Sequence, residues 1–97
     1  MYAIAFDLNQ DTLSKTYGSS SYNNAYTDIR RELDLYGFTR QQGSVYFGCE
    51  NVDAVTCVLA VQALSLKYPW FAASITDIRM LRIEDNNDLK PAIDMVL

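Results

Sequence analysis

The order in which two hydrophobic patterns alternate constrains the fold of this 97-residue chain more than any other feature. In four short segments apolar residues tend to recur at every second position, as they do in strands with one buried face. In two longer segments they recur at steps of three and four, or almost without interruption, which is typical of helices. The predicted order is strand 2–8, helix from Ser20 or Ser21 to about Tyr36, strand 38–41, strand 44–48, helix 51–66 and strand 75–85.

Residues between these segments support the predicted boundaries. Gly37 stands where a helix C-terminus favours a residue in the left-handed conformation. Asn51 is the predicted cap of the second long helix, Asp53 lies in its first turn, and Pro69 ends it. Residues 9–19 are polar and are predicted to form a long loop with room for one helical turn.

This order of elements predicts an α+β, ferredoxin-like βαββαβ fold, in which an antiparallel sheet carries both helices on one face. Trp70 and Phe71 are predicted to form a bulky turn before the last strand, and a short C-terminal segment begins near Asp88. A chain of this length is expected to form one domain, residues 1–97. Because the second face of the sheet is open, a homodimer that covers it is the expected assembly.

The absence of histidine narrows the chemistry available to the chain. It removes imidazole metal ligands and every triad or dyad with a histidine base. Two cysteines, Cys49 and Cys57, are too few for a structural zinc site and are expected to be free thiols. The net charge of −4 argues against a general nucleic-acid coat. With no export signal or membrane-length apolar run in view, a cytoplasmic location is expected.

Short motifs spread over nearly the full chain match one known pattern. They are M-Y-A-I-A-F-D-L at 1–8, A-Y-T-D-I at 25–29, G-F at 37–38, Q-G-S-V-Y at 42–46, W-F at 70–71, D-I-R at 77–79 and I-E-D at 83–85. With these motifs the chain resembles the virulence-associated protein D (VapD) family, which looks like a relative of the ferredoxin-like CRISPR-associated adaptation endonucleases. The resemblance implies a dimer of open sheets. It also implies an endoribonuclease that cleaves RNA as the toxin of a bacterial toxin–antitoxin pair, with a cognate antitoxin as its partner.

Asp7 is the leading catalytic candidate. It ends the first strand on the same face as Ala3 and Ala5, whose small side chains leave room for a partner backbone. Two Asp7 carboxylates could therefore meet near a dimer axis, where they would share a proton or recruit a cation such as Mg²⁺. Asp7 is thus a candidate metal ligand or general base. The alternative is a solvated acid at the end of a strand.

Ser44, Asp77 and Arg79 are the supporting catalytic candidates. Ser44 follows Gly43, and in the family pattern this pair resembles an active-site element whose hydroxyl could hold a phosphate oxygen. A turn serine that satisfies its own backbone is the alternative. Asp77 and Arg79 share one face of the last strand, where Arg79 could stabilise phosphorane charge while Asp77 orients it or binds metal. For these two, an ion pair of little energetic consequence is the alternative.

Arg40, Arg82 and Tyr46 are the RNA-binding candidates. If the two arginines lie on neighbouring strands, they form a phosphate track, and Tyr46 could stack an unpaired base. A place in the core or at the dimer interface is the favoured alternative for Tyr46. Arg31 is expected on a solvated helix face, paired with nearby acids.

Two routes to RNA cleavage stay open without histidine. One is metal-assisted hydrolysis with Asp7, and the other is metal-free transesterification by the RNA 2′-hydroxyl, helped by Tyr, Asp or Arg side chains. Two other functions also stay open, a non-catalytic dimeric interaction module and a DNA endonuclease of the CRISPR adaptation type.

Overall fold

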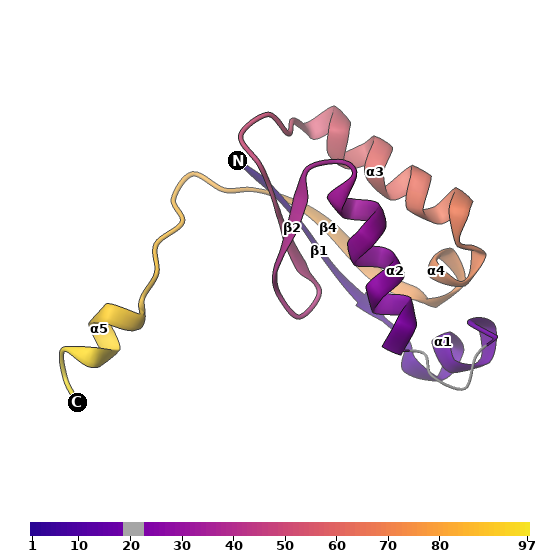
Figure 1. Ribbon diagram of the computed structural model, residues 1–97, viewed down its shortest axis with the longest axis horizontal. Coiled ribbons are helices and arrows are strands. Elements are labelled where there is room, and N and C mark those ends of the chain that lie inside the picture. The colour runs from indigo at the N-terminus through magenta and orange to yellow at the C-terminus, as the bar shows by residue number, and fades with distance from the viewer. Residues whose placement is uncertain (19–22) are drawn as a thin grey trace.

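The computed structural model describes residues 1–18 and 23–97. At its centre lies a four-stranded antiparallel sheet with the strand order β2-β3-β1-β4 (Figure 1). The strands are β1 (Tyr2–Leu8), β2 (Phe38–Gln42), β3 (Val45–Gly48) and β4 (Ile75–Arg82). Helices α2 (Asn23–Asp34) and α3 (Ala54–Lys67) lie over one face of the sheet. This arrangement confirms the predicted ferredoxin-like α+β fold.

The hydrophobic core lies between the sheet and these two helices. Strand β1 alternates, so that Ile4 and Phe6 face the helices and are only 2% and 5% exposed. Helix α2 adds Ile29, which is fully buried. Phe6 stacks on Tyr46 of β3 with 6.0 Å between ring centroids and meets Phe71 edge-on at 5.8 Å. The odd-numbered residues of β1 are consequently left for the opposite face of the sheet.

A short helix forms within the segment that is predicted to be a long loop with room for one helical turn. Helix α1 (Gln10–Thr16) begins after Asn9, whose side chain accepts a hydrogen bond from the backbone N–H of Thr12 at 2.9 Å. That contact satisfies one of the free donors of the first turn. The helix also buries Leu13 completely. One capping residue and one buried leucine are enough to order a segment that otherwise looks like a polar loop.

The cap of α3 is Asp53 and not Asn51. The Asp53 carboxylate accepts hydrogen bonds from the backbone N–H and the hydroxyl of Thr56, both at 2.8 Å. These bonds lower the pKa of Asp53, because they favour its charged form. The predicted cap of α2, Ser20 or Ser21, lies outside the described residues.

The segment after α3 is helical where a turn is predicted. Pro69 opens helix α4 (Pro69–Ser74), because proline suits the first turn of a helix. Trp70 and Phe71 lie within α4, and Phe71 is 2% exposed. Strand β4 ends at Arg82, short of the predicted 85, because its partner residue on β1 is Tyr2 at the start of that strand.

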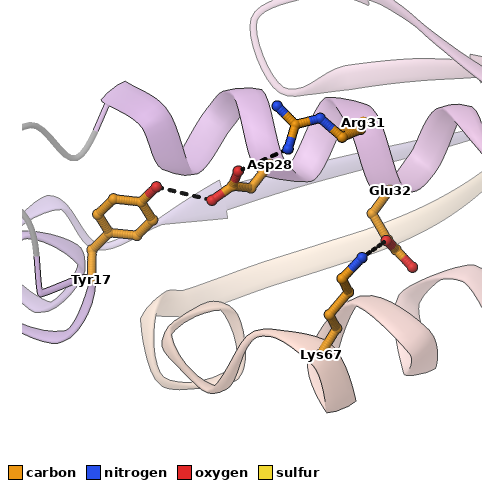
Figure 2. A network of polar contacts seen from close by, with 5 residues as sticks. All are labelled: Tyr17, Asp28, Arg31, Glu32 and Lys67. Carbon is orange, nitrogen blue, oxygen red and sulfur yellow. Dashed lines mark hydrogen bonds and ion pairs between the residues drawn. The ribbon is translucent and has the colours of Figure 1, made fainter.

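Polar contacts connect α2 to its neighbours (Figure 2). Glu32 is 7% exposed, and the Lys67 ammonium at the end of α3 donates to its carboxylate at 3.0 Å. Asp28 accepts a hydrogen bond from the Tyr17 hydroxyl at 2.9 Å and pairs with Arg31 at 3.6 Å. The last contact confirms the ion pairing expected for Arg31.

Besides strand β4, which exposes Met80 and Leu81, two apolar surfaces of the described residues have nothing over them. Helix α3 exposes Val55, Val58, Leu59 and Leu66. The C-terminal tail, with the short helix α5 (Lys90–Asp94), extends away from the sheet (Figure 1). It exposes Leu89, Ile93, Met95, Val96 and Leu97. Of the helices in residues 1–18 and 23–97, none has the length and apolar character needed to cross a membrane.

Candidate active site

All four catalytic candidates surround one cavity on the open face of the sheet. Asp7, Ser44, Asp77 and Arg79 line it together with Ala5, Phe6 and Val45, and its volume is about 250 Å³. The candidates come from β1, from the turn before β3 and from β4. The fold therefore brings together four side chains that lie far apart in the sequence.

Strand register explains this convergence. Asp7 lies directly opposite Asp77, and Ala5 lies opposite both Arg79 of β4 and Val45 of β3. Side chains at paired positions project from the same face of a sheet. Because Ala5 is small, the charged groups on either side of it border an open space rather than a filled one.

Backbone contacts on both sides hold the end of β1. The backbone N–H of Phe6 donates to the carbonyl of Ser44 at 3.1 Å, which attaches the β2–β3 turn to β1. The pairing of β1 with β4 shifts register after Asp7, and the Thr76 hydroxyl donates to the Asp7 carbonyl at 3.1 Å. Such irregularities re-aim side chains and are common beside functional sites.

Of the two carboxylates in the cavity, Asp77 forms an ion pair with a described residue and Asp7 does not. The Nε–H of Arg79 donates to both carboxylate oxygens of Asp77, at 3.0 and 3.2 Å. This contact raises the pKa of Arg79 above its ordinary value. Asp7 is exposed, and among the ion pairs of the described residues none includes it. The cavity thus combines a free carboxylate with an oriented guanidinium, which suits proton transfer beside a developing anion.

The oxygen donors of the cavity fit a hard divalent cation. Asp7 and Asp77 supply carboxylates and Ser44 a hydroxyl, and Mg²⁺ usually binds through one or two carboxylates with water and substrate phosphates. In the part of the chain that the structure describes, no three His, Cys, Asp or Glu side chains form a metal-binding group. Because Arg79 occupies Asp77, Asp7 is the freer ligand, and the substrate or a second copy of Asp7 would have to complete the coordination.

Of the three RNA-binding candidates, Arg40 and Tyr46 lie together, and Arg82 lies apart from them. Arg40 is on β2 and Arg82 is on β4, the two opposite edges of the sheet, so the predicted track along neighbouring strands is wrong. The Tyr46 ring is 2% exposed and stacks on Phe6, so it has no free face for a base. Its alternative place in the core is confirmed. Burial also raises the pKa of the Tyr46 phenol.

A second cavity, of about 480 Å³, was not foreseen from the sequence. It lies between α2 and the β2–β3 hairpin, and its lining includes Arg30, Arg40, Ser44 and Tyr46. Arg40 belongs here because its register partner on β3 is Tyr46, which faces the helices. The i, i+3 and i, i+4 spacing of Arg30 from two other lining residues of α2 marks a polar helix face. That spacing does not reveal the hairpin opposite it.

Known proteins match the chain over nearly all of its length. Residues 1–90 match the family model described as CRISPR associated protein Cas2. Endoribonuclease VapD 2 of Riemerella anatipestifer is 56% identical over 93 residues, which cover 96% of this chain and 99% of the relative. Endoribonuclease VapD homolog of Helicobacter pylori is 50% identical over 97 residues, all of both chains. Endoribonuclease VapD of Dichelobacter nodosus is 47% identical over 88 residues, 91% of each chain. The chain therefore belongs to the CRISPR-associated Cas2 family, in which it groups with the VapD proteins, as its sequence motifs indicate.

Proposed function

We propose that this protein is an endoribonuclease and that the cavity lined by Asp7, Ser44, Asp77 and Arg79 is its active site. The observation that carries the proposal is that these four side chains converge on one cavity, in which Asp7 forms no ion pair with another described residue. Support also comes from the names of the relatives, two of which share half or more of the aligned sequence and are called endoribonucleases.

In the proposed reaction Asp7 is the general base. Its carboxylate takes the proton from the attacking oxygen, which is either the RNA 2′-hydroxyl or a water, as the new P–O bond forms. The P–O bond to the leaving oxygen breaks, and that oxygen takes a proton from solvent. Arg79, oriented by Asp77, donates to the phosphate oxygens on which negative charge grows. The Ser44 hydroxyl donates to another phosphate oxygen. When Mg²⁺ is bound, Asp7 and Ser44 would instead be its ligands, and the chemistry supplied is neutralisation of phosphate charge.

The proposed working form is a homodimer. The open face of the sheet presents Phe47 and Leu81, which flank the small Ala3 and leave a shallow apolar surface. Leu81 is 47% exposed, and the apolar tail residues are more exposed still. A second copy of the chain would cover both surfaces and would bring two Asp7 carboxylates toward each other.

The proposed biological setting is the bacterial cytoplasm, where the protein acts as the toxin of a toxin–antitoxin pair. A ribonuclease with an open active site is a hazard to the RNA of its own cell, so a protein antitoxin that covers the cavity is the expected regulator. Expression of the wild type should arrest growth, whereas expression of Asp7→Asn should not. Arrest by both variants would mean that toxicity does not depend on this cavity.

Cleavage of a labelled single-stranded RNA by pure protein tests the proposed function. Asp7→Asn should cleave at least about a hundredfold more slowly than wild type, as expected for loss of a general base. Asp11→Asn is the matched control, since Asp11 is exposed on α1 and does not line the cavity. If Asp7→Asn cleaves as fast as this control, the assignment is wrong.

Two further experiments distinguish the endoribonuclease from a DNA endonuclease and from a non-catalytic interaction module. A 2′-deoxy substrate that is cut as fast as RNA would indicate a DNA endonuclease, because DNA has no 2′-hydroxyl. Absence of cleavage both with Mg²⁺ and with EDTA would favour the non-catalytic interaction module. Cleavage in EDTA would indicate the metal-free route.

A further inference from the structure

The cavity between α2 and the β2–β3 hairpin concentrates positive charge in an acidic protein. Arg30 enters it from α2 and Arg40 from β2. Its other lining residues are Asn23, Tyr26, Thr27, Gly43, Ser44 and Tyr46, so no acid is among the described side chains that line it. The chain as a whole carries a net charge of −4. A cavity that gathers two arginines against that background is suited to an anion.

The donors of the cavity are held in place and are not used up. The Nε–H of Arg40 donates to the Gly43 carbonyl at 2.8 Å, which fixes the guanidinium while its terminal N–H groups stay available. The Tyr26 hydroxyl accepts a hydrogen bond from the Gln10 amide at 2.6 Å, so its own proton is left to donate. Among the described residues, neither Arg30 nor Arg40 takes part in an ion pair.

Both positive charges also act on one buried group. Burial raises the pKa of the Tyr46 phenol, and the charges of Arg40 and Arg30 oppose that increase. Arg30, Arg40 and Tyr46 line the same cavity from three different elements. Arg31, the sequence neighbour of Arg30, pairs with Asp28 on the same helix at 3.6 Å (Figure 2). It also lines an adjoining cavity together with Arg30, Arg40 and Asp34.

The arginine cavity and the active-site cavity share a wall. Ser44 lines both of them, at the turn that leads from β2 into β3. The backbone of this residue is attached to β1 through the Phe6 N–H. The phosphate backbone of an extended nucleic-acid strand could therefore pass around this turn. One of its phosphates would lie beside Asp7 and another between the two arginines.

We propose that Arg30 and Arg40 together bind a backbone phosphate of single-stranded RNA next to the one that is cleaved. This inference rests on the proposed function, since it gives the substrate a path to the Asp7 cavity. Two guanidiniums can each offer paired N–H donors to phosphate oxygens. The contact fixes the strand without reading its sequence, so binding through it is strongly dependent on salt.

Binding of a fully 2′-O-methylated single-stranded RNA in EDTA tests the proposal, because this probe resists both cleavage routes. Fluorescence anisotropy over a range of salt concentrations gives the affinity and its salt slope. Arg30→Gln and Arg40→Gln should each weaken binding about tenfold, the loss expected for one charge-assisted contact. Each should also reduce the slope by about 0.7. Arg30→Lys should keep most of the slope.

Lys15→Gln is the control for the loss of one positive charge, because Lys15 is exposed on α1 and lines neither of the two cavities that Arg30 and Arg40 border. It should bind RNA like wild type. Equal weakening by Lys15→Gln and Arg30→Gln would overturn the proposal, because net charge alone would then explain the effect. Unchanged binding by both Arg30→Gln and Arg40→Gln would also overturn it. The proposal would also be overturned if Arg30→Gln weakened the binding of inorganic phosphate but left RNA binding unchanged, because the site would then bind a free anion.

The result is independent of the outcome for the active site. Asp7→Asn should bind this RNA at least as tightly as wild type, because it removes a negative charge beside the cleaved phosphate. If Asp7→Asn also cleaves normally while Arg30→Gln loses affinity, the assignment of Asp7 fails and the phosphate site stands. If Asp7→Asn is inactive and the arginine variants bind normally, the active site stands and the phosphate site fails.

Discussion

Replacement of Gly37 by alanine should destabilise the protein through two separable effects. Gly37 has a φ of +88°, in the left-handed region, where a residue with a Cβ atom costs about 1 kcal/mol. A Cβ at this position would also lie 3.1 Å from both the Cys49 Sγ and the Val52 Cγ2. Such crowding costs at least about 1 kcal/mol more. The expected decrease in the free energy of unfolding is therefore about 2–3 kcal/mol.

Gly43→Ala is the control that isolates the second effect. Gly43 also has a positive φ, +48°, but a Cβ there would meet nothing within 4 Å. Its expected decrease is about 1 kcal/mol from backbone strain alone. Urea unfolding, followed by fluorescence at one fixed protomer concentration, measures both variants, with m about 1–3 kcal/mol/M. Equal decreases for Gly37→Ala and Gly43→Ala would refute the predicted contact between the end of α2 and the segment after β3.

Three further predictions concern the Asp77–Arg79 pair, the two cysteines and the Lys67–Glu32 pair. Asp77→Asn should lower kcat about tenfold with little change in KM, because Arg79 loses the carboxylate that orients it; an unchanged single-turnover rate would contradict this role. A thiol reagent should label the exposed Cys49 well before the buried Cys57, because desolvation raises the pKa of the Cys57 thiol. Mass spectrometry after partial labelling measures the two rates, and equal rates would contradict the prediction. The pKa of Lys67 is raised by the hydrogen bond to its carboxylate partner on α2. The contribution of this pair to stability is therefore full below the ordinary lysine pKa and is lost as pH rises through the higher folded-state value. Alkaline urea titrations should show a steeper loss for wild type than for Lys67→Gln, and parallel curves would argue against the pair.

The sheet and the first cavity could be predicted from the sequence because alternation assigns side chains to faces. Asp7 falls on the small-residue face of the first strand, and Asp77 and Arg79 share one face of the last. In a ferredoxin-like order these two strands are neighbours, so their outward residues meet. Ser44 joins them because the β2–β3 turn is attached to the end of β1.

Other features depend on contacts that sequence periodicity does not encode. Asn51 and Asp53 are both good helix caps, and only the path of the chain out of β3 selects Asp53. Glu32 lies three residues after the buried Ile29, and helical spacing does not reveal that Lys67 meets its carboxylate from another helix. The separation of Arg40 from Arg82 follows from strand order across the sheet rather than from their own sequence surroundings.

A double-mutant cycle on the rate of RNA cleavage tests the central claim most directly, namely that Asp7 and Arg79 act on one phosphate. Single-turnover rates would be measured for wild type, Asp7→Asn, Arg79→Gln and the double variant. Each single variant should lose at least about tenfold, and the double variant should be about as slow as the slower single variant, because groups that act as a unit are not additive. Losses that multiply, as they do for independent positions, or an Asp7→Asn rate equal to wild type, would contradict the account.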